Sequence, residues 1–330
     1  MTHDVDEIRA LISNRDNFYI SGHVNPDGDS IGACFGLGLA LEKMGKKVQV
    51  LLEAFHSKYT VIPGNHLIWD GTDPLSEPDD ATLICVDCAD ISRLTGHAKS
   101  MAETLSHTIC IDHHYSNTSF AKYNFVDGTA SSTCEMVYRL LDNFVALNQD
   151  IASALYAGMV SDTGGFRHAA TSKDTLEAVS NLISLGIPFT EIYTELVHLR
   201  TYTEIKLLTR VLNSCRRSQD AQIVHACVPQ DMMIGFEGTP DATINDLEGV
   251  VEYLLNIRRA KVSLLVYDRG GGEVKISLRS RKINVGAIAQ QFGGGGHRLA
   301  AGATIKGNVF EVRDKVLPLI EEALISGRIE

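Results

Sequence analysis

The sequence predicts an α/β protein in which an N-terminal domain built on a parallel sheet precedes a smaller C-terminal α/β domain. In the first half of the chain, short and nearly continuous apolar runs alternate with helical patterns, which is typical of parallel strands covered by helices on both faces. The chain has 330 residues, of which 44% are hydrophobic. A chain of this size favours two domains over one.

Three apolar runs in the first half are followed by side chains that can bind metal. They are residues 17–20, which lead into His23, residues 83–86, which end at Asp87, and residues 108–111, which end at Asp112, His113 and His114. Helical patterns over residues 31–44 and 131–144 lie between and after them. The carboxyl ends of parallel strands line up along one edge of a sheet, where ligands bind. We therefore expect the three polar segments to meet in one place.

A fourth polar segment follows a predicted buried helix over residues 151–160. Ser161, Asp162 and Thr163 come directly after it, and Gly164 and Gly165 follow. Two glycines let the backbone turn sharply after the helix, so that the carboxylate of Asp162 can project from its end. A carboxylate that only ends the helix is the simpler alternative.

The rest of the chain predicts a helical connector and a second domain. Helical patterns cover residues 172–186, 189–197 and 203–211. Beyond them, the pattern predicts strands over residues 221–228, 260–267 and 273–278 and helices over residues 285–292 and 309–325. We expect a metal-binding domain over residues 1–187, a connector over 188–212 and a substrate-binding domain over 213–330.

Composition narrows the functional classes. The formal net charge of −11 argues against broad binding to duplex DNA, which depends on Lys and Arg that neutralise phosphates. No apolar run approaches the length of a membrane span, and the N-terminus lacks the basic and apolar regions of a signal peptide. The seven cysteines, an odd number, fit buried reduced thiols. We therefore expect a cytoplasmic protein with no membrane partner.

Six of these polar residues form a candidate metal-binding set. They are His23, Asp27, Asp29, Asp87, His113 and Asp162. Two imidazoles and four carboxylates are about the number that two ions need when they share a bridging carboxylate. Oxygen and imidazole ligands without thiolate favour Mn²⁺, with Mg²⁺, Co²⁺ and Zn²⁺ as alternatives. Two such ions would support hydrolysis of a phosphate ester or anhydride. The opposing interpretation is a set of separate, solvated acids at strand ends and turns.

The motifs resemble those of a known family. HVNPDGD at residues 23–29, VD at 86–87, DHH at 112–114 with Ser116 and Asn117, and SDTGG from Ser161 resemble the four motifs of the DHH phosphoesterases. FGGGGHRLAAGA at residues 292–303 resembles the glycine-rich motif of the DHH-associated domain in oligoribonucleases of the nanoRNase (NrnA) type. The resemblance covers nearly the whole chain.

This resemblance implies a role for each residue in the first domain. One ion would be held by His23, Asp27 and Asp87, and the other by Asp29, Asp87, His113 and Asp162, with Asp87 as the bridge. His114 would face the substrate phosphate and stabilise its charge or the leaving oxygen. Asp112 would orient a histidine. Asn25 would contact the phosphate or orient the loop, with a plain turn-forming role as the alternative.

The resemblance also implies a nucleotide-binding role for residues of the second domain, namely Arg279, Ser280, Gly295, Gly296 and His297. We expect residues 293–296 to form a loop between a helix and a strand, where backbone N–H groups can approach a phosphate or base. A flexible turn would explain the glycines equally well. Arg279 suits bidentate contact with phosphate. Gly165 and His168 stand where relatives often carry larger or aromatic residues. The sequence therefore does not define which residues form the pocket for the base.

Together these features predict an active site in the cleft between the domains, which only short substrates would fill. We expect a manganese-dependent phosphodiesterase that cleaves very short single-stranded RNA, such as dinucleotides and pApA, to mononucleotides, with phosphatase action on 3′-phosphoadenosine 5′-phosphate. The sequence leaves a homodimer open. The alternatives are a cyclic di-AMP phosphodiesterase, an inorganic pyrophosphatase of the DHH type and a catalytically silent nucleotide-binding regulator.

Overall fold

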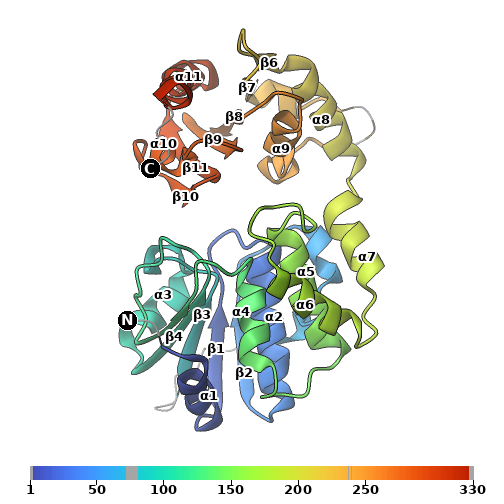
Figure 1. The fold of residues 1–330 in the computed structure, drawn as a ribbon, viewed down its shortest axis with the longest axis vertical. Helices are drawn as coiled ribbons and strands as arrows, with labels where there is room; N and C mark the ends of the chain where they lie inside the picture. Colours follow the sequence, from blue (N-terminus) through green and yellow to red (C-terminus); the bar gives the residue numbers. More distant parts are fainter. Residues whose placement is uncertain (1–2, 72–80, 237, 239, 327–330) are drawn as a thin grey trace. The chain divides into compact units, whose positions relative to one another are not determined.

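The computed structural model describes residues 3–71, 81–236, 238 and 240–326. The chain divides into two compact units, Met1–Leu199 and Arg200–Glu330 (Figure 1). Their boundary falls inside residues 188–212, the stretch in which the sequence predicts a connector. Within the described ranges, no helix combines the length and the apolar character needed to cross a membrane.

The first unit is built on a five-stranded sheet in which every pair of neighbours is parallel, as the sequence predicts. The strand order is β2-β1-β3-β4-β5. The strands are β1 (Asn17–Ser21), β2 (Lys47–Leu51), β3 (Thr82–Val86), β4 (His107–Asp112) and β5 (Tyr123–Val126). The chain departs from β1 in opposite directions to reach β2 and β3, so the order reverses beside β1. In such sheets ligands bind at this reversal, outside the carboxyl ends of the strands.

Helices cover both faces of this sheet. They are α1 (Val5–Ser13), α2 (Gly28–Lys43), α3 (Gly96–Thr104), α4 (Thr133–Leu141), α5 (Gln149–Asp162), α6 (Lys173–Ile183) and α7 (Phe189–Tyr193), with short turns η1 (Ser57–Val61), η2 (Asn65–Leu67), η3 (Ile91–Arg93) and η4 (Thr194–His198). Ile20 and Ile84 share the larger core with α2, α4 and α5, whereas Leu83 and Cys85 pack with residues of α3. Figure 1 shows α3 on one side of the strands and α2, α4 and α5 on the other. Residues that alternate along β3 therefore pack against helices on opposite faces.

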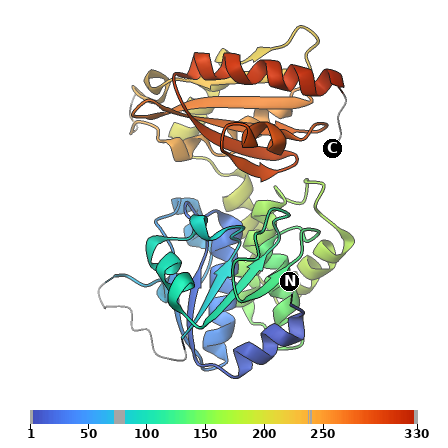
Figure 2. The same cartoon turned by 90° about the vertical axis from the view of Figure 1, so that its left-hand side faces the viewer.

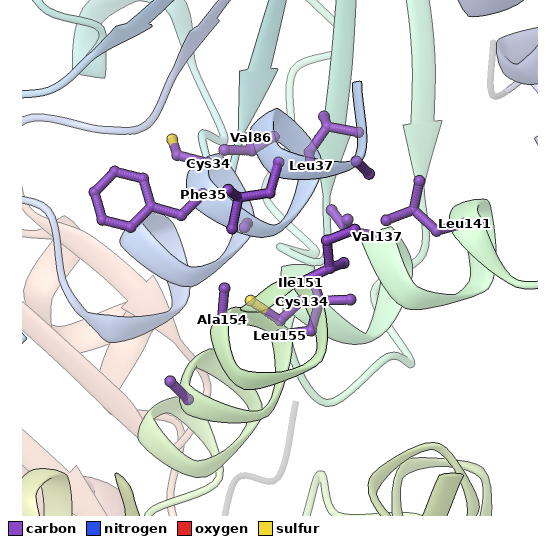
Figure 3. Close-up of a cluster of buried hydrophobic side chains, with 14 of the residues drawn as sticks. Cys34, Phe35, Leu37, Val86, Cys134, Val137, Leu141, Ile151, Ala154 and Leu155 are labelled. Carbon is purple, nitrogen blue, oxygen red and sulfur yellow. The ribbon is translucent and has the colours of Figure 1, made fainter. Parts of the chain in front are cut away.

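The larger core brings α2, α4 and α5 into close contact. Figure 3 shows Phe35 and Leu37 of α2, Cys134 and Val137 of α4, and Leu155 of α5 in this cluster. Where α2 meets α5, a Cβ at Gly32 would lie 2.6 Å from the carbonyl oxygen of Ala154. This close packing fixes the N-terminal ends of α2 and α4 relative to each other, and the candidate site lies at those ends.

The start of α2 differs from the sequence prediction. The helical pattern predicts a start at residue 31, but the helix begins at Gly28. Asp27 is its N-cap, because its carboxylate accepts hydrogen bonds from the backbone N–H groups of Asp29 and Ser30. Asp29 therefore lies in the first turn of a helix and not in a loop.

The second unit is built on a six-stranded mixed sheet of order β10-β11-β9-β8-β7-β6. The strands are β6 (Arg216–Arg217), β7 (Ile223–Val228), β8 (Val262–Gly270), β9 (Glu273–Ser280), β10 (Gly295–His297) and β11 (Ala300–Lys306). Only β7 and β8 pair in parallel among the described strands of this sheet. This agrees with a smaller α/β domain at the C-terminus.

Helices also cover this second sheet. They are α8 (Tyr202–Ser214), α9 (Val250–Leu255), α10 (Val285–Gln290) and α11 (Val309–Ser326), with turns η5 (Gln230–Met233) and η6 (Ile244–Leu247). One core joins α10 and α11 to the sheet, and a separate core joins α8 and α9 to it. Figure 2 shows α11 lying along this sheet. The face of β9 and β11 opposite α10 and α11 carries Arg279, which bears on the site described below.

Candidate active site

The first cluster of site residues consists of His23, Asp27 and Asp87, which are close enough together to hold one metal ion. His23 follows β1 and Asp87 follows β3, so both lie where the strand order reverses. The Nε2 atom of His23 is 3.4 Å from Oδ2 of Asp87 and 3.8 Å from Oδ2 of Asp27. Nδ1 of His23 is 2.9 Å from the carbonyl oxygen of Val24 and donates to it, because a carbonyl oxygen only accepts. This leaves Nε2 facing the two carboxylates, as in histidines that bind metals.

The second cluster consists of Asp29, His113 and Asp162, which likewise converge closely enough to hold an ion. Nε2 of His113 is 3.5 Å from Oδ2 of Asp162 and 3.9 Å from Oδ2 of Asp29. The opposite ring atom, Nδ1, is 3.3 Å from the carbonyl oxygen of Ala130. Asp162 is the last residue of α5, and Gly164 and Gly165 after it adopt positive φ angles of 57° and 71°. The sequence predicts this turn.

Asp29 is held by the N-terminus of another helix. Its two carboxylate oxygens accept hydrogen bonds from the backbone N–H groups of Thr133 (2.6 Å) and Cys134 (2.9 Å), the first two residues of α4. A helix N-terminus stabilises negative charge through these N–H groups and the helix dipole. Burial, with the negative charges of Asp87 and Asp162, nevertheless raises the pKa of Asp29 well above its usual range. A cation among these acids would relieve that repulsion, so the donor set fits a metal.

Asp87 connects the two clusters. Its Oδ2 faces His23 of the first cluster, whereas its Oδ1 is 3.7 Å from Nε2 of His113 and accepts a hydrogen bond from the hydroxyl of Thr133 at 3.1 Å. Asp87 has φ 55°, a left-handed conformation that is rare for residues other than glycine. Although burial acts in the opposite direction, the hydrogen bond from His23 and the charges of His114 and His113 lower the pKa of Asp87 well below its usual range.

Asp112 fixes the orientation of His114. One oxygen of this fully buried carboxylate is 2.7 Å from Nδ1 of His114, and the other accepts a hydrogen bond from the side chain of Asn117 at 2.6 Å. Burial lowers the pKa of His114, but the Asp112 hydrogen bond and the charge of Asp87 raise it overall, to about 9. His114 therefore carries a proton near neutral pH. Its Nδ1 is also 3.7 Å from Oδ1 of Asp87, which places the ring beside both clusters.

Asn25 adopts the same rare backbone conformation as Asp87, with φ 55°. Its backbone N–H donates to the carboxylate of Glu53 at 3.1 Å. Asparagine tolerates this conformation better than most residues, which fits the turn-forming alternative.

Thr133 and the first amides of α4 are contacts that the sequence analysis missed. A signal for them exists, because the segment Ser132–Thr133–Cys134–Glu135 has a serine N-cap three residues before a glutamate. The hydroxyl of Ser132 does accept the backbone N–H of Glu135 at 3.0 Å. The pattern indicates a helix N-terminus, and such a terminus can hold an anion, here the carboxylate of Asp29.

In the second unit, Arg279 and His297 are brought onto one face of the sheet. Ala300 of β11 pairs with Arg279 of β9 on one side and with His297 of β10 on the other, and directly paired residues project to the same face. The guanidinium of Arg279 is 3.7 Å from the carboxylate of Glu252 on α9. Ser280 projects to the opposite, buried face, where its hydroxyl accepts the backbone N–H groups of Lys282 and Ile283.

The glycine-rich segment is partly a strand, where the sequence predicts a loop. Gly295 and Gly296 belong to β10. A Cβ at Gly294 or Gly296 would come within 2.1 Å or 2.5 Å of a carbonyl oxygen of β11, so these two glycines allow close approach of the strands. Around Gly295, in contrast, nothing lies within 4 Å of a Cβ position. Both glycines of β10 are exposed, and Gly295 also has free space where a Cβ would lie. The predicted cleft between the domains stays a prediction.

Both units of the chain are similar to known proteins. Residues 17–159 match the N-terminal domain of the DHH family, and residues 222–325 match the DHHA1 domain. The bifunctional oligoribonuclease and PAP phosphatase NrnA of Thermus thermophilus is 32% identical over 93% of this chain and 90% of that protein. The protein of the same name in Bacillus subtilis is 25% identical over 96% of this chain and 97% of its own length. An exopolyphosphatase-related protein of Bacteroides fragilis has a crystal structure similar to this one, with a TM-score of 0.83 and 27% identity over 98% of this chain and 95% of that chain.

Proposed function

Because the chain belongs to the DHH family of metal-dependent phosphoesterases, we propose that it hydrolyses very short oligoribonucleotides, such as pApA, to mononucleotides. We further propose that it removes a phosphate from 3′-phosphoadenosine 5′-phosphate. The relatives from Thermus and Bacillus carry both activities in their names, and the similarity extends over both units of this chain.

The observation that carries the proposal is the position of the Asp87 carboxylate, whose two oxygens turn toward different clusters. Such a carboxylate suits a bridge between two ions, for which we propose Mn²⁺. One ion would be held by His23, Asp27 and Asp87, and the other by Asp29, Asp87, His113 and Asp162. Two bound cations supply hydroxide at neutral pH and offset the charge on the phosphoryl group. The protein contributes ligands that are already oriented by Val24, Ala130 and the N-terminus of α4.

His114 is proposed to act on the substrate and not on a metal. Its Nδ1 is turned toward the buried carboxylate of Asp112, and this hydrogen bond favours the protonated ring by raising its pKa. A protonated imidazole held in this way can donate a hydrogen bond to a phosphate oxygen or a proton to the leaving oxygen. Asp112 and Asn117 would keep the ring in position during the reaction.

Residues of the second unit are proposed to bind the nucleotide part of the substrate. Arg279 and His297 lie on one face of the sheet, and Gly295 exposes its backbone near them in the same strand arrangement. Arginine pairs with phosphate through two hydrogen bonds, and backbone N–H groups can bind a phosphate or a base edge. Ser280 would support this surface from within the fold, because its hydroxyl accepts backbone N–H groups, whereas Gly296 is exposed beside Gly295 and would bind the nucleotide with it.

A parallel substrate assay tests the proposed function. Purified protein with Mn²⁺ is given pApA, a longer single-stranded RNA, cyclic di-AMP, 3′-phosphoadenosine 5′-phosphate and pyrophosphate. We expect the highest kcat/KM for pApA. A preference for cyclic di-AMP or pyrophosphate would replace the proposal with the corresponding phosphodiesterase or pyrophosphatase. Bound metal without turnover of any of the five would support a silent regulator.

A further inference from the structure

We propose that Tyr115 is a stacking platform for a nucleobase of the substrate, located on the first unit beside His114. The inference rests on the proposed function, because it requires a nucleotide substrate. It adds a binding site for the base that lies next to the cleaved phosphate, in addition to the nucleotide-binding residues proposed for the second unit.

The position of Tyr115 is the first observation. Tyr115 directly follows His114, and neighbouring Cα atoms are about 3.8 Å apart, so the backbone places the two residues next to each other just after β4. Its side chain is 80% exposed, which is unusual for a large aromatic residue so close to a cluster of buried charges. Leu176 and Phe189, two other exposed large apolar residues of this unit, lie on helices α6 and α7 instead.

The second observation is that the ring of Tyr115 packs closely against the backbone at Gly128. A Cβ at Gly128 would lie 2.7 to 3.0 Å from three atoms of the Tyr115 ring. Gly128 is not among the glycines with positive φ, so its backbone conformation does not itself require glycine. The space that a side chain would take is occupied by the ring. Tyr115 therefore rests on the main chain at Gly128 while most of its surface faces solvent.

Hydrogen bonds connect the turn that contains Gly128 to residues of the active site. The N–H of Asp127 donates to the carbonyl oxygen of Asp112, and the carboxylate of Asp127 accepts hydrogen bonds from the backbone and the hydroxyl of Thr129. The same carboxylate forms an ion pair with Arg139 at 2.8 Å. Ala130 lies two residues after Gly128, and its carbonyl oxygen accepts a hydrogen bond from His113. A ring placed on such a fixed turn loses little conformational freedom when a ligand binds.

An exposed aromatic ring in this position suits a nucleobase. Bases stack on aromatic side chains whatever their identity, because every base has a π face. A single platform next to the reacting phosphate suits a substrate of one or two nucleotides, whereas a longer strand would need a series of such rings. Tyr115 would thus add affinity for the base without choosing among bases.

Binding of AMP and of ribose 5-phosphate separates the base from the sugar and phosphate. Both ligands are titrated by calorimetry into the full chain with Mn²⁺, using wild type, Tyr115→Ala, Tyr115→Phe and, as a control, Tyr202→Ala, which removes an exposed tyrosine of α8. We expect Tyr115→Ala to weaken AMP binding about fivefold to 150-fold, the effect typical of losing one stacked base. Ribose 5-phosphate binding should stay unchanged, and Tyr115→Phe and Tyr202→Ala should bind AMP as wild type does.

Three results would overturn the proposal: equal affinity of the wild type for AMP and ribose 5-phosphate, unchanged AMP binding by Tyr115→Ala, or equal weakening of both ligands by that variant. Circular dichroism and thermal melting of the variants show whether the fold is intact. Hydrolysis of pApA, measured on the same preparations, keeps the two proposals apart. Turnover with a KM that Tyr115→Ala does not change would remove the platform and leave the proposed function standing. Absence of pApA turnover would remove the proposed function, whereas the AMP titration would still decide whether the ring binds a base.

Discussion

The first and second clusters contain the same kinds of ligand but are supported in different ways. In the first cluster, His23 donates to the carbonyl of its neighbour Val24, and Asp27 caps the helix that it starts. In the second cluster, Asp29 is bound by amides of α4 more than a hundred residues along the chain, and His113 by the carbonyl of Ala130. The first cluster is therefore organised by local contacts and the second by tertiary packing.

The two supports have different electrostatic consequences. The carboxylate of Asp27 is half exposed, and although burial acts in the opposite direction, the neighbouring His23 lowers its pKa. Asp29 is 1% exposed and faces Asp87 and Asp162, and its pKa is raised. The pKa values of these two aspartates, only two residues apart, thus shift in opposite directions. Asp27 ends a loop, whereas Asp29 is enclosed by a second helix. The second cluster depends more on cations to offset its charge.

Replacing Asp87 with Asn should have the largest effect, because it removes the charge that both clusters share. Loss of a residue that only orients a metal ligand typically lowers activity by roughly tenfold to a hundredfold. Because Asp87 is itself a proposed ligand, we expect the rate of pApA hydrolysis to fall by more than this. Asparagine keeps the shape and the oxygen that accepts from Thr133, so the fold should survive. Initial rates and circular dichroism measure the two effects. Near-normal turnover by a folded variant would contradict the bridging role.

Replacing His114 with Ala should lower kcat by about a hundredfold to a thousandfold, the usual cost of losing a group that stabilises developing charge. Both metal ions should remain bound, since His114 is assigned to the substrate. Elemental analysis of the purified variant counts the ions, and steady-state kinetics gives kcat. Loss of one metal equivalent would assign His114 to a cluster instead.

Replacing Thr133 with Val tests the contact between α4 and Asp87, the carboxylate that the two clusters share. Valine keeps the shape and the backbone amide that binds Asp29, but removes the hydroxyl that donates to Asp87. We expect Mn²⁺ affinity to fall by about tenfold to a hundredfold, as for other partners that orient a ligand. Titration of metal-free protein with Mn²⁺ measures this, and Thr133→Ser, which keeps the hydroxyl, should restore it. Equal loss in both variants would point to packing and not to the hydrogen bond.

Replacing Arg279 with Ala should have a smaller effect, confined to binding. A hydrogen bond from a charged group contributes about 1.5–3 kcal/mol, or at least tenfold in affinity. Glu252 lies near Arg279 and offsets part of its positive charge, so we expect an effect at the lower end of this range. KM for pApA should rise about tenfold, with kcat unchanged. Replacement of Arg313, which pairs with Asp314 on α11, provides a surface control. A change in kcat without a change in KM would contradict a binding role.

The smallest predicted effect is a release of protons when metal binds. Although burial acts against it, hydrogen bonds to Asp27 and Asp87 raise the pKa of His23 to about 11 in the metal-free protein. The protonated ring thus stabilises the metal-free fold fully below about pH 6.5, and this contribution is lost as pH rises through 11. A metal ligand must be neutral, so Mn²⁺ binding at pH 8 should release a proton and should weaken as pH falls. Calorimetry in buffers of different ionisation enthalpy measures the release, which should shrink in His23→Ala.

In the five-stranded sheet of the first unit, the strands that the sequence predicts and those that it misses differ in position. The three predicted apolar runs correspond to β1, β3 and β4, which lie inside the sheet and are buried on both faces. The missed strands, β2 and β5, are its two edges, and their residues are partly exposed. Edge strands are covered on fewer sides, so they lack the continuous apolar run that reveals a central strand.

Residue types and their place at strand ends were enough to predict the parallel fold and the meeting of the polar segments, whereas the DHH family and the division into two clusters came from the resemblance of the motifs. The fold prediction works because parallel strands deliver their carboxyl ends to one edge whatever else the chain does. Packing alone decided which oxygen of Asp87 faces which cluster, that α4 binds Asp29, and that the ring of Tyr115 rests on Gly128. Every residue except proline has a backbone N–H, so the Ser132–Glu135 pattern can mark the helix N-terminus but not the carboxylate that its amides bind. The direction in which the N–H groups of α4 point depends on how α2, α4 and α5 pack in the core, and this packing is a property of the folded chain.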